Sequence, residues 1–262
     1  MKILLTGYKG FIGKNFLEHL KDHELSLYEW GETFPTIQGL DWVIHLGALT
    51  STTERNIEKL MIQNYDFSCF LFHECGKFNV NMQFASSASV YGLGKNFNED
   101  AELSPQSPYA WSKYLFERYV KQNLQQYSKI LVQGFRYYNV WGKYEDHKAD
   151  QASPYTKFTQ QALTEGEIRL FEDSNRYYRD FVPVETVIDV HKQFLKIKKS
   201  GIWNLGTGIP TSFQSIAEEI SNKYNVPIRY ISMPQNLKSQ YQAYTCADLT
   251  KLKNTLNEKS RS

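Results

Sequence analysis

A tyrosine and a lysine four residues apart, Tyr109 and Lys113, are the pair in this sequence best suited to proton transfer. Residues at that spacing share one face of a helix, so we expect the Lys113 ammonium to lie beneath the Tyr109 phenol and favour its ionised form. Ser87 ends an apolar segment upstream and is expected to hydrogen-bond the same substrate oxygen. Ser86 and Ser89 are close by, but strand residues alternate between faces, so Ser87 is the one expected in the cleft. Together the three groups predict hydride transfer at a carbinol or carbonyl carbon, with Tyr109 exchanging the proton.

A glycine-spaced turn lies near the start of the chain, where Gly7, Gly10 and Gly13 follow the apolar run 2–5. In a strand–turn–helix unit the first glycine allows a tight turn, the second lets a pyrophosphate approach the backbone, and the third permits close helix–strand packing. The amino end of the following helix adds partial positive charge. A glycine run or a Tyr–Lys pair occurs often by chance, but their order and context here predict a dinucleotide site.

Three further residues bear on the dinucleotide. Glu29 ends the second predicted strand, where its carboxylate can accept hydrogen bonds from ribose hydroxyls and repel a 2′-phosphate, which favours NAD. Lys9 stands within the glycine turn and either pairs with a 2′-phosphate or is a solvated surface lysine, so these residues leave NAD and NADP both open. Asn64 is expected on a helix, where it either braces the strand of Ser87 through side-chain to backbone hydrogen bonds or is simply exposed.

Strand-like and helix-like segments alternate along the chain, which predicts an α/β protein with a Rossmann-type, doubly wound parallel sheet and ligands at the carboxyl ends of its strands. The expected strands cover 2–5, 25–28, 40–46, 81–85 and 130–135, with a strand and turn over 203–208, and the expected helices cover 11–21, 57–75, 109–126, 185–196 and 212–224. The last helix is expected to be capped by Thr211 or Ser212. We expect a dinucleotide-binding Rossmann domain over 1–142, joined by a returning segment at about 180–210, and a smaller, mainly substrate-binding lobe over 143–262.

Composition narrows the function classes. The 262 residues, 41% of them hydrophobic, can bury the core of a single compact enzyme, and a net charge of +2 without a basic cluster disfavours nucleic acid. The chain opens on a strand-like run without a leader, and no apolar run approaches ~20 residues, so we expect a cytoplasmic protein that does not bind a membrane. The three cysteines show no metal-ligand spacing and fit a reduced compartment, and they form no metal-binding group with His45 or His147.

Together these motifs resemble those of the extended short-chain dehydrogenase/reductases, the NAD-dependent epimerase and dehydratase family of nucleotide-sugar enzymes. Within that family the chain is most similar to the ADP-L-glycero-D-manno-heptose 6-epimerases, through the segments 51–54, 134–142, 145–148, 171–174 and 241–245. The resemblance implies an isomerase that removes hydride from C6 of the heptose, keeps the reduced cofactor bound and returns the hydride to the other face. It implies NADP as the cofactor, with NAD possible, and a place in the synthesis of surface lipopolysaccharide. We also expect a homo-oligomer.

The resemblance also implies roles for individual residues. Lys148 would be a second acid/base beside Tyr109, because epimeric hydroxyls point in different directions from one carbon. Alone it would be taken for a charged loop residue, but the flanking Glu145 and His147 favour the catalytic role. The expected cofactor site comprises Gly7, Lys9, Gly10, Phe11, Ile12, Gly13, Glu29, Trp30, Leu46, Gly47, Ala48, Asn64, Lys113 and Val140. The expected substrate site comprises Ser87, Asn139, Lys157, Phe171, Ser174, Arg179 and Tyr241, with Arg179 suited to hold a phosphate.

The chain departs from the family pattern in two places. Only a short loop joins Glu29 to Asp41, where relatives carry a helix and a further strand, so the groups that normally enclose adenine are expected to be missing. After residues 248–252 no closing helix is expected.

Two alternatives to this assignment remain. One is another nucleotide-sugar epimerase, dehydratase or reductase of the same family. Dehydratases carry an acidic pair where Ala88 and Ser89 stand here, which disfavours elimination. The other is a non-catalytic dinucleotide-binding relative, which the retained Ser87, Tyr109 and Lys113 disfavour.

Overall fold

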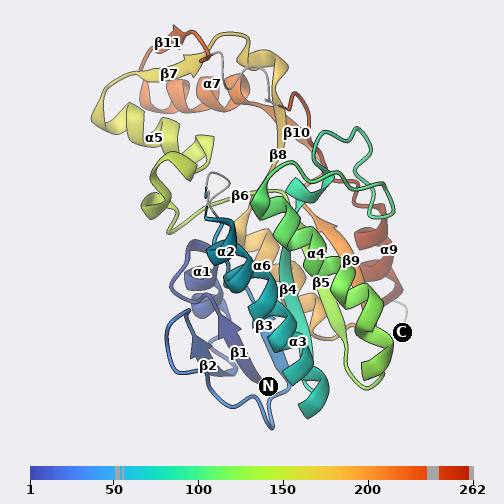
Figure 1. Ribbon diagram of the computed structural model, residues 1–262. Coiled ribbons are helices and arrows are strands. Elements are labelled where there is room, and N and C mark those ends of the chain that lie inside the picture. The colour runs from blue at the N-terminus through green and yellow to red at the C-terminus, as the bar shows by residue number, and fades with distance from the viewer. Residues whose placement is uncertain (51–53, 55, 235–241, 260–262) are drawn as a thin grey trace.

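The computed structural model describes residues 1–50, 54, 56–234 and 242–259 (Figure 1). Its main sheet has six parallel strands in the order β2-β1-β3-β4-β5-β9, which confirms the predicted doubly wound architecture. These strands are β1 (Lys2–Thr6), β2 (Glu24–Tyr28), β3 (Trp42–His45), β4 (Asn81–Ser87), β5 (Val132–Tyr137) and β9 (Gly201–Leu205). Their carboxyl ends meet at one edge, where a parallel sheet binds its ligands.

Helices cover both faces of this sheet. In β1, Ile3 and Leu5 pack into a core with α1 and α6, whereas Leu4 packs into a second core with α3 and α4. The alternation follows from the two-residue period of a strand, and burial on both faces explains the nearly continuous apolar runs of the central strands. The helices around the sheet are α1 (Phe11–His19), α2 (Ile57–Met61), α3 (Phe67–Phe78), α4 (Pro108–Asn123), α6 (Val184–Phe194) and α9 (Thr250–Lys259).

Two helical predictions need correction. The single helix expected over 57–75 is interrupted, because a π-helical segment, Ile62–Asp66, joins α2 to α3. The expectation of no closing helix is wrong, because α9 packs against β9. Leu252 is buried, and Thr255 accepts a hydrogen bond from Trp203 Nε1 at 3.0 Å. The inward face of the amphipathic helix α9 therefore completes this end of the core.

A smaller group of elements stands above the carboxyl edge of the main sheet (Figure 1). The two-stranded sheet β7–β11 packs with α5 and α7, and the three-stranded sheet β10-β8-β6 connects this group to the main sheet. Ser212 caps α7 by accepting a hydrogen bond from Ser215 N at 3.0 Å, so it is the capping residue of the two expected. The elements are β6 (Asn139–Trp141), α5 (Pro154–Thr164), β7 (Ile168–Phe171), β8 (Tyr178–Pro183), β10 (Pro210–Ser212), α7 (Phe213–Tyr224) and β11 (Ile228–Ile231).

Within the described ranges, no helix is long and apolar enough to cross a membrane. The three cysteines are free thiols, and no cluster of potential metal ligands occurs in the part of the chain that the structure describes.

Candidate active site

The glycine turn between β1 and α1 is tightly packed. Gly7 has a φ of +74°, and a Cβ there would lie 2.6 Å from Gly47 Cα. A Cβ on Gly13 would lie 2.1 Å from the Gly7 carbonyl oxygen, so both positions exclude any larger residue. Gly10 provides no side-chain cap to α1, so the first-turn amides face the end of the sheet as donors for an anion.

A small pocket of about 120 Å³ lies beside this turn, at the ends of β1, β2 and β3. Its lining includes five residues expected at the cofactor site, Gly7, Glu29, Trp30, Gly47 and Ala48, together with Thr6, Tyr28, Leu49, Gln63 and Phe67. The loop 29–41 contains no helix or strand, as the sequence predicts. In place of the helix and strand that relatives carry here, two aromatic rings form one side of the pocket. The half-exposed Trp30 ring meets Phe67 edge to face at 5.6 Å. Adenine would fit against these rings by stacking or edge contact.

Several expected cofactor residues do not line this pocket. Leu46 precedes Gly47 and its amide donates to the Thr6 carbonyl at 3.3 Å. Phe11 and Ile12 open α1. Val140 lies on β6 and lines a different, larger cavity.

Asn64 braces a segment other than the expected one. Its Oδ1 accepts from Leu49 N at 2.8 Å, and its Nδ2 donates to Leu49 O at 3.0 Å and to Ser112 Oγ at 3.2 Å. It therefore ties the segment after β3 to α4, and the expected bond to the strand of Ser87 is wrong. The π-helical segment that carries Asn64 could not be read from the apolar pattern of 57–75.

His45 also supports the turn. Its Nδ1 is 2.7 Å from Thr6 Oγ1 and its Nε2 is 2.8 Å from Ser68 Oγ, while Thr6 Oγ1 accepts from Gly47 N at 3.2 Å. Burial, and secondarily the charge of Lys113, lowers the pKa of His45 to about 3. The ring is therefore neutral, and both nitrogens are engaged within the protein.

Ser87, Tyr109 and Lys113 come together as the sequence predicts. Ser87 ends β4, and the Tyr109 hydroxyl is hydrogen-bonded to its side chain. Ser107 caps the first turn of α4, which presents Tyr109 and Lys113 on one face. Lys113 Nζ donates to Ala85 O at 2.9 Å and lies 6.0 Å from the centre of the Tyr109 ring. The group can therefore hold a substrate oxygen and exchange its proton.

The protonation of this group differs from the sequence expectation. Burial raises the pKa of Tyr109 to about 12, against the opposing effect of the Ser87 hydrogen bond. Burial also lowers the pKa of Lys113 to about 8, and the Glu117 carboxylate opposes that change. Burial therefore favours the protonated phenol here instead of the expected ionised form, and the Lys113 ammonium donates to the Ala85 carbonyl. In this structure the phenol is a proton donor.

Sequence reasoning missed a buried ion pair next to this group. Glu117 Oε2 accepts from Arg136 Nη2 at 2.7 Å, Glu117 Oε1 accepts from Ser86 Oγ at 2.5 Å, and both charged side chains are 3% exposed. The pair joins α4 to β4 and β5. Two features of the sequence could have indicated this pair. Glu117 follows Lys113 by four residues, and Arg136 stands within an apolar strand.

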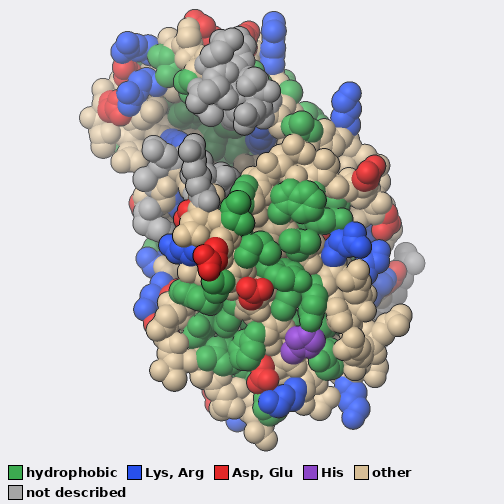
Figure 2. All heavy atoms as spheres, viewed as in Figure 1, with side chains coloured by type: hydrophobic (Ala, Val, Ile, Leu, Met, Phe, Trp, Pro, Cys, Tyr) green, Lys and Arg blue, Asp and Glu red, His purple; other side chains and the backbone are tan. Residues whose placement is uncertain are grey.

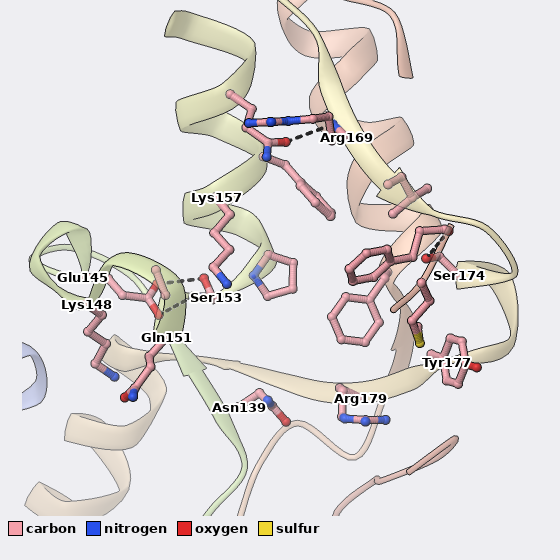
Figure 3. Close-up of a pocket in the computed structure, with 18 of the residues that line it drawn as sticks. Asn139, Glu145, Lys148, Gln151, Ser153, Lys157, Arg169, Ser174, Tyr177 and Arg179 are labelled. Carbon is pink, nitrogen blue, oxygen red and sulfur yellow. Dashed lines mark hydrogen bonds between the residues drawn. The ribbon is translucent and has the colours of Figure 1, made fainter. Parts of the chain in front are cut away.

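A cavity of about 720 Å³ opens within the smaller group of elements, with β6 on one side (Figure 3). Six residues expected to bind cofactor or substrate line it, along with Lys148: Asn139, Val140, Lys157, Phe171, Ser174 and Arg179. Ser87 is not among the lining residues, and Tyr241 lies outside the described residues. Lining residues that were not singled out as ligands include Gln151, Ser153, Phe158, Arg169, Tyr177, Phe213, Ile231 and Met233.

The charge of this cavity suits an anion with an apolar end. Four basic side chains, from Lys148, Lys157, Arg169 and Arg179, line it with a single carboxylate, that of Glu145. In Figure 3 Lys157 reaches from α5 into the opening, across from Asn139. Such a set of donors matches a diphosphate, and the aromatic lining matches a nucleobase.

Lys148 lies between the large cavity and the glycine turn. Its Nζ is 4.6 Å from the centre of the Phe11 ring at the start of α1. Burial lowers the pKa of Lys148, and the nearby Glu145 carboxylate opposes the change. Glu145 accepts from Ser153 N, Ser153 Oγ and Thr156 Oγ1, each at 2.7 Å, at the amino end of α5. This anchors the turn Asp146–Gln151 that carries Lys148.

Three solved structures illustrate what this chain is similar to. The UDP-N-acetylglucosamine 4-epimerase of Methanobrevibacter ruminantium is 22% identical with a TM-score of 0.88, over 97% of this chain and 91% of that one. The ADP-L-glycero-D-manno-heptose-6-epimerase of Helicobacter pylori is 25% identical with a TM-score of 0.85, over 98% and 90%. The UDP-glucose 4-epimerase of Thermotoga maritima is 23% identical with a TM-score of 0.86, over 98% and 93%.

Sequence and fold lead to one family. A family model matches residues 3–206, a range that includes the glycine turn, Ser87, Tyr109, Lys113 and most of the residues that line the large cavity. This chain belongs to the NAD dependent epimerase/dehydratase family.

Proposed function

We propose that this protein is a nucleotide-sugar epimerase, which oxidises one carbinol of its substrate and reduces it again on the opposite face. The observation that carries the proposal is the position of Lys148, which lines the anion cavity and contacts Phe11 of the glycine turn. It connects the space suited to a sugar nucleotide with the space suited to a dinucleotide.

The residues present fit a nicotinamide dinucleotide. The uncapped amino end of α1 offers amide donors for a pyrophosphate, Glu29 lies where ribose hydroxyls would bind, and Trp30 and Phe67 offer an aromatic wall to adenine. A bound nicotinamide would accept hydride from the substrate and later return it. Resemblance to the family favours NADP, and that choice stays a prediction.

Proton exchange is assigned to residues of this chain. Tyr109 and Ser87 would hold the substrate oxygen. The positive charges of Lys113 and of an oxidised nicotinamide would favour the phenolate of Tyr109, which would then take up the substrate proton and later return it. Lys148 would do the same for the epimeric hydroxyl. Burial lowers its pKa, which moves the ammonium toward the range where it can serve as an acid or a base at neutral pH.

We propose an ADP-heptose as substrate. Lys157 and Arg179 would hold the diphosphate, Asn139 and Ser174 would hydrogen-bond the sugar or nucleoside, and Phe171 would contact the base. The similarity to the Helicobacter pylori enzyme supports this choice. The first alternative is an enzyme of the same family that acts on a different nucleotide-sugar. The second alternative is a dinucleotide-binding protein without catalytic activity.

One experiment distinguishes these functions. Purified protein is incubated separately with ADP-heptose, UDP-glucose and UDP-N-acetylglucosamine, and the C6 and C4 configurations are followed by NMR. We expect inversion at C6 of ADP-heptose with no net change in the cofactor. Inversion at C4 of a UDP-sugar would show that the substrate is that sugar and not an ADP-heptose. Bound cofactor without inversion of any sugar would contradict the proposed epimerase function.

We also propose that the protein is a homo-oligomer. Ile57, Ile62, Phe70 and Trp111 are each at least 42% exposed, and they lie on α2, the π-helical segment, α3 and α4. Figure 2 shows hydrophobic side chains spread across this face. Two copies related by a two-fold axis would bury the same apolar surface on both.

A further inference from the structure

A second carboxylate lies beside the glycine turn, on Glu32 of the short loop after β2. Its Oε1 accepts from Lys9 Nζ at 2.6 Å and from the Tyr8 hydroxyl at 3.1 Å, and its Oε2 accepts from Glu29 N at 2.8 Å. All three donors belong to the turn or to the end of β2. Nothing in the sequence patterns singled out Glu32.

Glu29 is held from the other side of the same turn. Its carboxylate accepts from Lys9 N at 3.1 Å and from Trp30 N at 3.3 Å, and it lines the small pocket. Hydrogen bonding with Glu32 raises the pKa of Lys9, and the same bond lowers the pKa of Glu32. At neutral pH the adenosine end of the site therefore presents two carboxylates and one ammonium, and that ammonium is already paired.

This arrangement suits a free ribose better than a phosphorylated one. Two hydroxyls can donate to carboxylates, whereas a 2′-phosphate only accepts hydrogen bonds and would be repelled. Among the described residues that line the small pocket, none is a lysine or an arginine. Lys9 is the nearby cation that could offset the repulsion, and Glu32 engages it.

We propose that Glu32 is a specificity-determining residue, which holds Lys9 away from a 2′-phosphate and makes the protein prefer NAD to NADP. The inference rests on the proposed dinucleotide site and runs against the NADP that family resemblance implies. The short loop 29–41 is the cause, since it returns Glu32 directly over the turn.

Binding measurements without turnover test this inference. Dissociation constants are measured by calorimetry for NAD and NADP, and for the fragments 5′-AMP and adenosine 2′,5′-bisphosphate. We expect wild type to bind NAD at least about tenfold more tightly than NADP, which is about 1.4 kcal/mol. Glu32→Gln should bind NADP about tenfold more tightly than wild type does, and the ratio of NADP to NAD affinity should rise by at least that factor, because the freed ammonium can make a charge-assisted bond. Adding Lys9→Gln should remove that gain.

The matched control is Glu24→Gln, which changes the same charge on an exposed residue at the other end of β2. It should leave the ratio of NAD to NADP affinity at the wild-type value. Equal binding of NAD and NADP by wild type, or a Glu32→Gln shift no larger than the control's, would overturn the inference alone. Failure of folded wild type to bind either dinucleotide would overturn the proposed function as well.

Discussion

Tyr109 and Lys113 lie on one face of α4 but meet different partners, the Ser87 hydroxyl and the Ala85 carbonyl. The phenol consequently keeps its proton in this structure, while the ammonium has lost part of its usual preference for the charged form. A positive charge arriving with an oxidised nicotinamide would favour the phenolate. At the scale of single residues, the chemistry depends on how strongly the site is buried.

The Tyr109 hydroxyl can be tested alone. We expect Tyr109→Phe to lower turnover by a factor on the order of 10² or more, because the positioned proton-transfer group is lost. Tyr114→Phe is the control, since its hydroxyl accepts a bond from Arg118 on the outer part of the same helix. Sugar inversion is followed by NMR, and a wild-type rate in Tyr109→Phe would refute the assignment.

The ammonium of Lys113 makes stability depend on pH. Its folded pKa of about 8 lies below the ordinary value of 10.5, so the unfolded chain binds more protons between those values. The cost of burying the charge is full below pH 8 and falls as the pH rises toward 10.5. Between pH 7.5 and 9.5 we expect the free energy of unfolding of wild type to rise by about 2 kcal/mol relative to Lys113→Met, measured in urea. Parallel changes in the two proteins would exclude this role.

At the scale of elements, the Glu117–Arg136 pair fixes α4 against β4 and β5. Ser86, which donates to Glu117, is the neighbour of Ser87 in the chain. The same carboxylate therefore connects the strand of the reactive serine to the helix of Tyr109. Glu145 has a comparable place in the other half of the site, where it joins the turn of Lys148 to α5.

Removing one member of the buried pair should be costly. We expect Glu117→Leu or Arg136→Met to lower the free energy of unfolding by about 3–5 kcal/mol, because an uncompensated buried charge or donor remains. The double variant should recover most of that loss. Glu258→Gln, which breaks the exposed pair with Lys199, should cost no more than about 1 kcal/mol. Urea denaturation compares the four variants with wild type, and a single substitution as mild as the surface control would contradict this account.

At the scale of the whole molecule, the chain leaves the main sheet after β5 and returns to it at β9. Of the elements between them, α6 packs on the main sheet, whereas β6, α5, β7 and β8, with β10, α7 and β11, form the smaller group above the carboxyl edge. The limits of 1–142, with a returning segment at about 180–210, and 143–262 stay a prediction, and within the last range α9 packs against β9 of the main sheet. The described residues that line the large cavity belong to the smaller group and its connecting turns, and Lys148 among them contacts Phe11 of α1.

The proposed homo-oligomer can be tested on the whole molecule. We expect wild type to have the mass of at least two copies by light scattering, and Phe70→Asp with Trp111→Asp to have the mass of one, because two charges would be buried. Leu163→Asp, at a 65% exposed position on α5, is the control and should keep the wild-type mass. A monomeric wild type would contradict the proposal.

The sequence by itself determined the features that depend on local spacing. Glycine spacing predicted the turn of β1 and α1, the four-residue interval placed Tyr109 and Lys113 on one face, and alternating apolar segments predicted the parallel sheet. These inferences succeeded because helix and strand periods act over a few residues. The family resemblance, and not residue types, supplied the seven expected residues among the twenty described ones that line the large cavity.

Only the tertiary structure decided which distant groups meet. It placed Glu32 on Lys9, Glu117 on Arg136 and Asn64 against Leu49. It also set the pKa of Tyr109 and packed α9 against β9. Burial and contact between residues far apart in the chain depend on the complete fold, and the strength of charges and hydrogen bonds depends on burial.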